Sequence, residues 1–294
     1  MKNPWIEAMR LRTLPVSVAG VIAGTACALF FRSFQWIPAL CCLLFALGAQ
    51  IASNFANEYF DFRNGLDRKG REGFRRGVTE GDISPGAMLR ATLLTLLLAA
   101  IPGCILILWG GWWMLLVGIV VAIFALAYSA GPYPLSHHGL GDLAVIIFFG
   151  LLPVTLTAWL QVDSTAVVPM ALTVGLGVGM LAANVLIVNN YRDADDDRAV
   201  GKHTTVVLFG RPTMARVYLM FVIVGCALMC APAWWMGAIW QFPIVAIIPG
   251  IRVWRKMIVA SGAELNDILR RTAMTLLLVS AILLLESLLS IIWR

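Results

Sequence analysis

Long apolar runs, separated by short polar segments, dominate the pattern of this sequence. A helix needs about 20 mostly apolar residues to cross the hydrocarbon core of a bilayer, and about nine stretches approach that length. We therefore predict an all-α protein, a multi-pass transmembrane bundle of about nine helices. The predicted spans are residues 14–31, 36–60, 87–109, 111–128, 142–160, 166–190, 213–231, 233–250 and 272–292.

Composition supports this class. Of the 294 residues, 60% are hydrophobic and 13% are charged, whereas a soluble domain carries about 25% charged residues. The net charge of +6 would suggest a nucleic-acid partner in a soluble protein. Here the basic residues sort by membrane topology, so we predict contact with the lipid bilayer and no nucleic acid.

The basic residues also predict the orientation. With nine spans, 20 of the 22 Lys and Arg residues fall on one side, and only Arg32 and Arg294 fall on the other. The positive-inside rule makes the crowded side cytoplasmic. We therefore expect a bacterial cytoplasmic (inner) membrane protein with a cytoplasmic N-terminus and an outside C-terminus. The charged N-terminus runs straight into a full span, so we expect no cleavable signal peptide.

Two polar segments match each other. Asn-x-x-x-Asp occurs at 57/61 and again at 189/193, an offset of 132 residues with four spans between them. This predicts an internal duplication within a single membrane domain. The first repeat covers about residues 10–130, the second about 140–255, and a last helix about 272–292.

Each copy places oxygen-bearing side chains on one helical face. Residues four apart share a face, which pairs Asn57 with Asp61. The turn signal Asn64-Gly65 then ends the helix and returns Asp67 toward Asp61. The same spacing in the second copy aligns Asn189, Asp193 and Asp197.

Hard oxygen ligands of this kind suit Mg²⁺, which binds through one or two carboxylates together with substrate phosphate oxygens. Acids and bases gathered at one helix end therefore predict a diphosphate site. Solvated loop charges are the alternative, but it does not explain polar asparagines inside apolar helices, where they mark sites or interhelical bonds. These asparagines are Asn54, Asn57, Asn189 and Asn190, and the nearby basic residues include Arg75, Arg76, Arg192 and Lys202.

At these residues the sequence resembles the UbiA superfamily of intramembrane aromatic prenyltransferases. The first motif of that family is similar to residues 57–67, although the family more often has Asp where Glu58 stands, and the second is similar to residues 190–197 with Gly201-Lys202. Within the family, the branch that prenylates 1,4-dihydroxy-2-naphthoate is also similar at Arg12-Thr13-Leu14-Pro15, at Asp82-Ile83-Ser84-Pro85 and at residues 128–142.

The resemblance implies a cavity among nine helices that opens to the cytoplasmic interface and into lipid. It also implies transfer of a polyprenyl group from polyprenyl diphosphate to 1,4-dihydroxy-2-naphthoate, with loss of diphosphate and CO2, giving demethylmenaquinol. Two Mg²⁺ ions would lie between the motifs and the diphosphate. The implied metal ligands are Asn57, Asp61, Asp67, Asn189, Asp193 and Asp197, of which the four acids are the catalytic residues.

Other residues are expected to bind the substrates. Arg192, Lys202 and one of Arg75 or Arg76 would contact phosphate oxygens, beside Asn54 and Asn190. Acceptor contacts are expected from residues 128–142. There Tyr128 can instead belong to the aromatic belt and Asp142 can cap a helix. The expected acceptor contacts are Tyr128, Tyr133 and Asp142.

Two other acceptors and one other class of protein are alternatives to a prenyltransferase that acts on naphthoate. The hydroxybenzoate enzymes of the family carry Tyr-Pro-x-x-Lys-Arg, whereas Tyr133-Pro134 here precedes two histidines at 137–138, which disfavours hydroxybenzoate. A homogentisate-like acceptor stays open. A secondary transporter is disfavoured because its sites lie near the bilayer midplane. The sequence assigns no role to His137, His138 or Glu286, and it fixes neither isoprenoid length nor oligomeric state.

Overall fold

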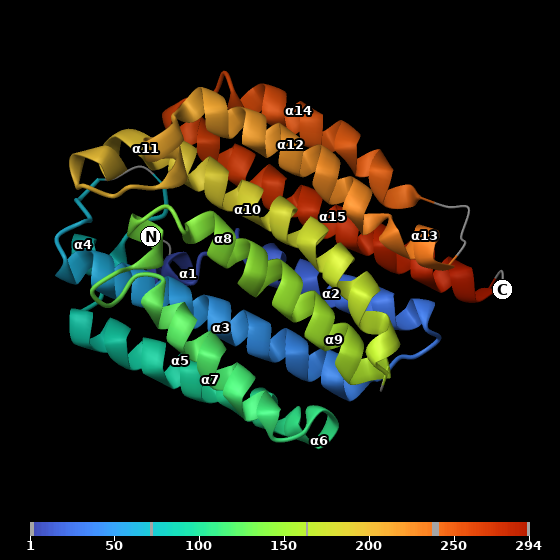
Figure 1. The fold of residues 1–294 in the computed structure, drawn as a ribbon. Helices are drawn as coiled ribbons and strands as arrows, with labels where there is room; N and C mark the ends of the chain where they lie inside the picture. Colours follow the sequence, from blue (N-terminus) through green and yellow to red (C-terminus); the bar gives the residue numbers. More distant parts are fainter. Residues whose placement is uncertain (1–2, 71–72, 163, 237–240, 293–294) are drawn as a thin grey trace.

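A computed structural model describes residues 3–70, 73–162, 164–236 and 241–292, and every regular element in these ranges is helical. The helices run roughly along one direction in an elongated bundle (Figure 1). Six of them are long and apolar enough to cross a membrane, and Pro15–Phe30 and Trp113–Ala127 are shorter apolar helices. The chain is therefore the all-α integral membrane protein that the apolar runs predict.

The helices keep the order of the predicted spans. The apolar helices and the helical turns adjoining them are α2 (Pro15–Phe30), α3 (Trp36–Arg63), α5 (Pro85–Ile105), α6 (Ile107–Gly110), α7 (Trp113–Ala127), α8 (Gly141–Val145), the π-helical turn η2 (Ile146–Leu151), α9 (Leu152–Val162), η3 (Thr165–Val167), α10 (Val168–Ala199), α12 (Arg211–Met229), α13 (Ala231–Met236), η4 (Phe242–Ala246), α14 (Ile247–Met257), η5 (Gly262–Glu264) and α15 (Leu265–Ile292). Four short elements lie in the connections, namely α1 (Pro4–Ala8), α4 (Gly77–Glu80), η1 (Leu135–His137) and α11 (Thr205–Phe209).

Two predicted spans begin at the wrong residue. The predicted span 233–250 corresponds to a helix over 242–257, and residues 237–240 of that span lie outside the described residues. Pro243 stands in the first turn of this helix, where a missing N–H costs nothing. The last helix begins near 262 rather than 272, because Asp267 pairs with Arg270 and Arg271 one turn on and keeps these charged residues helical.

The centre of the bundle is α10, which packs against α2, α9, α12 and α15. Helices from opposite ends of the chain also meet, because α2 lies along α15. Small residues allow the closest approach between η2 and α10. A Cβ at Gly150 would lie 2.3 Å from the carbonyl oxygen of Gly175 and 2.4 Å from the Cα of Gly179. Such contacts are typical of helix packing in membranes.

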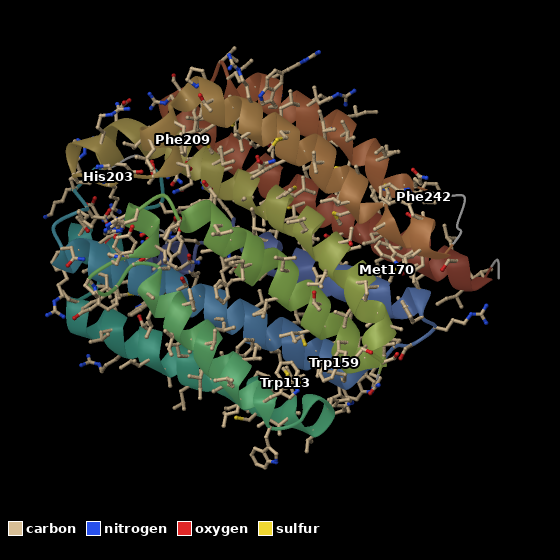
Figure 2. All side chains as sticks on the ribbon, in the orientation of Figure 1. Trp113, Trp159, Met170, His203, Phe209 and Phe242 are labelled. Atoms are coloured by element: carbon tan, nitrogen blue, oxygen red, sulfur yellow. The ribbon has the colours of Figure 1, made fainter. Side chains whose placement is uncertain are left out.

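Helix length places both motifs at one end of the bundle. The 28 residues of α3 and the 32 residues of α10 extend for about 42 and 48 Å, more than the hydrocarbon thickness of about 30 Å. Their last turns therefore reach beyond the hydrocarbon. The N-terminus lies at this same end and the C-terminus at the opposite one (Figure 1). In Figure 2, His203 and Phe209 mark the end with the motifs, and Trp113, Trp159 and Met170 mark the other.

Candidate active site

Both motifs line one cavity at this end of the bundle. The first motif contributes Asn57 and Asp61, and the second contributes Asn190 and Asp197. Loops and neighbouring helices complete the wall. The further polar lining residues are Arg10, Thr13, Gln50, Ser53, Asn54, Arg76, Tyr128, Ser136, Asp142, Asn189, Lys202, Thr204 and Thr205.

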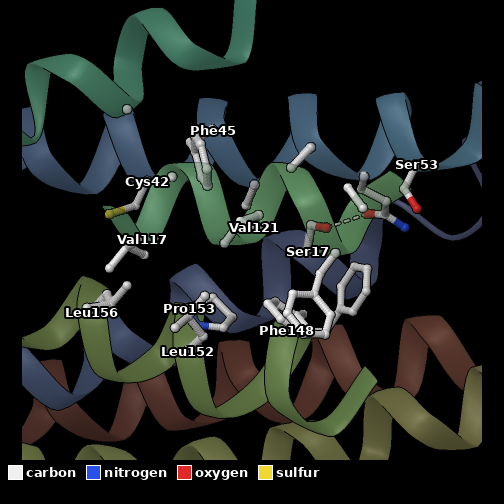
Figure 3. Close-up of a pocket in the computed structure, with 18 of the residues that line it drawn as sticks. Ser17, Cys42, Phe45, Ser53, Val117, Val121, Phe148, Leu152, Pro153 and Leu156 are labelled. Atoms are coloured by element: carbon white, nitrogen blue, oxygen red, sulfur yellow. Dashed lines mark hydrogen bonds between the residues drawn. The ribbon is translucent and has the colours of Figure 1, made fainter. Parts of the chain in front are cut away.

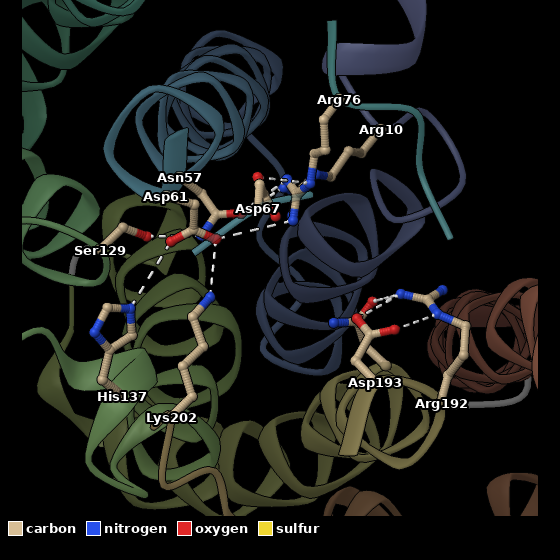
Figure 4. Close-up of polar contacts among 11 residues, drawn as sticks. Arg10, Asn57, Asp61, Asp67, Arg76, Ser129, His137, Arg192, Asp193 and Lys202 are labelled. Carbon is tan, nitrogen blue, oxygen red and sulfur yellow. Dashed lines mark hydrogen bonds and ion pairs between the residues drawn. The ribbon is translucent and has the colours of Figure 1, made fainter. Parts of the chain in front are cut away.

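The Asp61 carboxylate lies at the centre of the polar contacts (Figure 4). Lys202 Nζ donates to Asp61 Oδ2 at 3.0 Å, and Asn57 Nδ2 donates to the same oxygen at 3.2 Å. His137 Nε2 lies 3.8 Å from Asp61 Oδ1, and Arg76 Nη2 lies 3.9 Å from Oδ2. Lys202 follows the second motif by five residues and is 6% exposed, so this ion pair joins the two motifs across 141 residues.

The end of α3 folds as the turn signal predicts. Helix α3 ends at Arg63, Gly65 takes a left-handed φ of +69°, and the Leu66 amide donates to the Asp61 carbonyl oxygen. The chain then returns Asp67, whose side chain is fully buried and lies 3.3 Å from Arg76 Nε. Arg76 thus contacts both Asp61 and Asp67.

Asn57 is a hub for groups from four segments. Its Nδ2 donates to Asp61 and also to Ser129 Oγ at 2.9 Å. Its Oδ1 accepts from Arg76 Nη1 at 3.1 Å and from Arg10. The polar residue inside an apolar helix therefore fixes the relative positions of α3, the N-terminal segment and the loops after α3 and α7.

The second motif is arranged differently. Asn189, Asp193 and Asp197 share one face because α10 continues unbroken to Ala199, nine residues past the predicted end of the span. Arg192 holds Asp193 through two bonds, Nε to Oδ1 at 2.7 Å and Nη2 to Oδ2 at 2.8 Å. Both side chains are almost fully buried.

Arg192 has further partners that hold it in place. It donates to Asn189 Oδ1 at 2.9 Å and to Asn266 Oδ1 on α15 at 2.7 Å. Gly73 lies against its guanidinium, because a Cβ there would be 2.6 Å from Arg192 Cζ. The structure therefore brings Arg192 to Asp193 and does not place it in the cavity lining, where a phosphate contact was expected.

Four more predicted residues do not line the cavity, namely Asp67 and Asp193, which pair with arginines as described above, and Arg75 and Tyr133. The Arg75 side chain is 53% exposed and pairs with Asp82 at 2.7 Å, which raises the pKa of the Arg75 guanidinium. Tyr133 is 58% exposed and stacks on His138 with ring centroids 3.6 Å apart. Of the adjacent arginines, only Arg76, with a side chain 10% exposed, lines the cavity.

Asn54, Asp142 and Tyr128 lie on the inner wall of the cavity. Asn54 donates to the carbonyl oxygen of Met9 at 3.0 Å, which joins α3 to the residue that caps the C-terminal end of α1. Asp142 makes no capping bond at the start of α8. Instead its Oδ2 accepts from Thr205 Oγ1 at 2.5 Å, while Oδ1 is buried and accepts no hydrogen bond from the described residues.

An apolar chamber continues from this wall along the bundle (Figure 3). It lies among α2, α3, α5, α7 and α8–α9, and Phe45, Val121 and Leu152 are among its lining residues. On α7 the lining runs from Met114 to Tyr128, a length of about 21 Å. The chamber and the polar cavity share the residues Gln50, Ser53, Tyr128, Val145 and Phe149, so one opens into the other.

Sequence reasoning missed several residues of the site. Arg10 contacts Asn57 and lines the cavity, and its signal was its place two residues before the Arg12-Thr13-Leu14-Pro15 stretch. Ser129 follows the predicted Tyr128 directly. Thr205 carried no signal, because only the fold brings α11 beside Asp142.

The donor atoms fit a hard cation. Asp61 Oδ1 is buried and accepts no hydrogen bond from the described residues, and its neighbours in the motifs are carboxylate and amide oxygens. No three His, Cys, Asp or Glu side chains gather as a closed metal cage within the described ranges. Such a site suits Mg²⁺, which keeps waters and substrate oxygens among its ligands.

Comparisons with known proteins agree with this geometry. The UbiA prenyltransferase family matches residues 17–279. A 1,4-dihydroxy-2-naphthoate octaprenyltransferase of Mycobacterium tuberculosis is 32% identical over 93% of this chain and 92% of its own. Another of the same name from Escherichia coli is 36% identical over 77% and 74%.

Solved structures share the fold. A UbiA homologue from Aeropyrum pernix in its apo form superposes with a TM-score of 0.70 at 16% identity, over 97% of this chain and 99% of that one. A homologue from Archaeoglobus fulgidus bound to GPP and Mg²⁺ gives 0.65 at 16% identity, over 96% and 98%. By sequence and fold, this chain belongs to the UbiA prenyltransferase family.

Proposed function

We propose that this protein transfers a polyprenyl group from polyprenyl diphosphate to 1,4-dihydroxy-2-naphthoate, releasing diphosphate and CO2 and giving demethylmenaquinol. One observation carries the proposal: a polar pocket built from both acidic motifs opens into a long apolar chamber. A charged head group and an isoprenoid tail need this combination. The naphthoate acceptor is supported by the names of the relatives.

The polar pocket binds the diphosphate in this proposal. Lys202 and Arg76 are buried cations beside Asp61 and donate to phosphate oxygens. Oxygens of the six predicted ligands would hold two Mg²⁺ ions, whose positive charge would offset the negative charge that develops on the leaving diphosphate. Asp193 serves as a ligand only after Arg192 exchanges one of its bonds, since both carboxylate oxygens accept from Arg192.

The apolar chamber holds the isoprenoid tail and keeps water away. Breaking the allylic C–O bond leaves a carbon that water would capture, so a water-poor wall favours transfer to the acceptor. The reacting carbon lies where the chamber meets the polar pocket, near Tyr128 and Gln50, which line both. The acceptor therefore enters beside these two residues.

Asp142 orients the acceptor in this proposal. Its Oδ1 lies on the cavity wall and accepts no hydrogen bond from the described residues, and Thr205 holds the other oxygen. A ring hydroxyl of the acceptor donates to Oδ1, which draws electron density into the ring. The allylic carbon then bonds to the ring carbon that bears the carboxylate, and the pair from the broken C–CO2 bond returns to the ring as CO2 leaves.

We also place the protein in a bacterial cytoplasmic membrane, with the N-terminus and the active site at the cytoplasmic face. The support is the gathering of basic residues at the end of the bundle that carries the motifs. A phosphatase fused after residue 294 is expected to be active outside the cytoplasm. An active fusion at the loop after α3, near residue 70, would contradict this orientation.

The test of the reaction is product mass spectrometry. Membranes that contain the chain receive 1,4-dihydroxy-2-naphthoate or homogentisate, each with geranyl, farnesyl or longer prenyl diphosphates, with Mg²⁺ or with EDTA. The expected result is a prenylated, decarboxylated naphthoquinol that requires Mg²⁺ and is absent with Asp61→Asn. A product from homogentisate alone would overturn the acceptor. Uptake of one of these compounds into proteoliposomes, without any prenylated product, would instead indicate a transporter.

A further inference from the structure

Glu58 is a buried acid of the first motif that does not line the cavity. It is 1% exposed and stands on α3 beside Asn57, but successive helical residues are rotated by about 100°. Asn57 and Asp61 therefore face the cavity, whereas Glu58 points toward α4. Its Oε1 accepts a hydrogen bond from the Val78 amide at 3.0 Å.

This bond stands in for a missing helix cap. The first amides of a helix lack partners within it, and Arg76, the N-cap residue of α4, makes no side-chain capping bond. Glu58 supplies the acceptor from another helix. The fit is close, because a Cβ on Gly77 would lie 3.4 Å from Glu58 Oε1 and 3.0 Å from Ile83.

The segment that Glu58 holds also carries Arg76. Val78 and Ile83 pack with Phe55 of α3 and anchor the backbone on one side, and the Glu58 bond fixes it at the cap. From this backbone the Arg76 side chain reaches Asn57 at 3.1 Å and Asp67 at 3.3 Å.

We infer that Glu58 is a positioning residue for Arg76 and not a metal ligand: it fixes residues 76–78 so that the Arg76 guanidinium faces the bound diphosphate. This inference rests on the proposed function of the pocket. It also explains how this position of the motif can hold a buried acid whose hydrogen bond goes to a backbone amide.

A double-mutant cycle between Glu58 and Arg76 tests the coupling. The dissociation constant for Mg²⁺ pyrophosphate is measured on the purified protein by titration calorimetry. The KM for farnesyl diphosphate is measured separately. Glu58→Ala is expected to raise both the dissociation constant and the KM by about 10-fold, and Arg76→Ala is expected to raise both by about 30-fold. The double variant should match Arg76→Ala alone. Losses that multiply in the double variant would overturn the inference.

Glu58→Gln separates positioning from metal ligation. Its amide oxygen still accepts the Val78 N–H, so binding within threefold of the wild type is expected, whereas loss of a metal ligand is expected to abolish binding, as we also expect for Asp61→Asn. This variant also carries the test if Glu58→Ala fails to fold, as judged by its melting temperature. Asp82→Asn is the matched control, because Asp82 follows the segment that Glu58 holds but pairs with the exposed Arg75.

The two hypotheses fail in different ways. A wild-type protein that binds Mg²⁺ pyrophosphate but yields no prenylated product would overturn the proposed reaction. The double-mutant cycle of Glu58 and Arg76 could still be interpreted from the binding data. A productive wild type in which Glu58→Gln loses pyrophosphate binding would overturn the inference alone.

Discussion

The two acidic motifs differ in what neutralises them. Asp61 of the first motif pairs with Lys202, which comes from a segment 141 residues away, and its other oxygen accepts no hydrogen bond from the described residues. Asp193 of the second motif is held on both oxygens by Arg192, its immediate neighbour. One carboxylate is open toward a ligand and the other is closed by a local partner.

This difference shows that an equal spacing does not give an equal electrostatic state. Asn-x-x-x-Asp places an amide and an acid on one helical face in both motifs, but the residue between them decides the outcome. The first motif has Phe60 before its acid, and the second has Arg192. The first acid therefore depends on the tertiary fold for its counter-ion, and the second carries its own.

The largest expected effect is at the open carboxylate. Asp61→Asn removes the charge that faces Lys202, Arg76 and His137, and the initial rate of product formation in membranes is expected to fall by about 1000-fold. Asp195→Asn is the control, because Asp195 is an acid of the second motif whose side chain is 71% exposed. A rate for Asp61→Asn close to that of the control would remove the first motif from the chemistry.

The closed pair is tested by a charge-neutral double variant. Asp193→Asn leaves the buried Arg192 without its counter-ion, at a cost of about 3 to 5 kcal/mol, so the melting temperature should fall. Adding Arg192→Gln is expected to recover much of that stability but not the rate of transfer, since the proposal uses Asp193 as a ligand. Recovery of the rate as well would make this pair purely structural.

A smaller effect separates two adjacent arginines. Arg76→Ala is expected to raise the KM for the prenyl diphosphate by about 30-fold, because its side chain lines the pocket. Arg75→Ala should change the KM by less than about twofold, since an exposed ion pair contributes little. Steady-state kinetics with one donor gives both values, and equal effects would indicate general attraction by the loop charge.

The smallest effect concerns the apolar chamber. A Cβ at Gly118 would meet no atom within 4 Å, and Gly118 lines the chamber. Gly118→Phe should fill this space and lower the rate with long donors by about fivefold, with dimethylallyl diphosphate unaffected. Gly86→Phe, outside the chamber lining, is the control. An equal loss with short and long donors would show that the tail lies elsewhere.

The sequence predicts the helices well because apolar runs of spanning length have few alternatives. It fails where charged residues continue a helix, as in α10 and α15, since composition cannot distinguish a helical turn in water from a loop. The duplication of the two halves stays a prediction.

Within the site, spacing along a helix predicts that Asp61 joins Asn57. It does not distinguish Arg76 from Arg75, because the cap of α4 decides which of them turns inward. Nor does it reveal Thr205 beside Asp142 or Lys202 beside Asp61, which depend on long-range packing.

The ion pair between Lys202 and Asp61 determines the order in which the metal ion and the substrate bind. A lone divalent ion that reaches the open oxygen of Asp61 is repelled by an ammonium group that lies 3.0 Å from the other oxygen, so it gains little on its own. A diphosphate gives that ammonium group a new partner and brings oxygens of its own. The pocket is therefore expected to bind the ion and the substrate together. Lys202 is expected to pair with Asp61 again each time the product leaves.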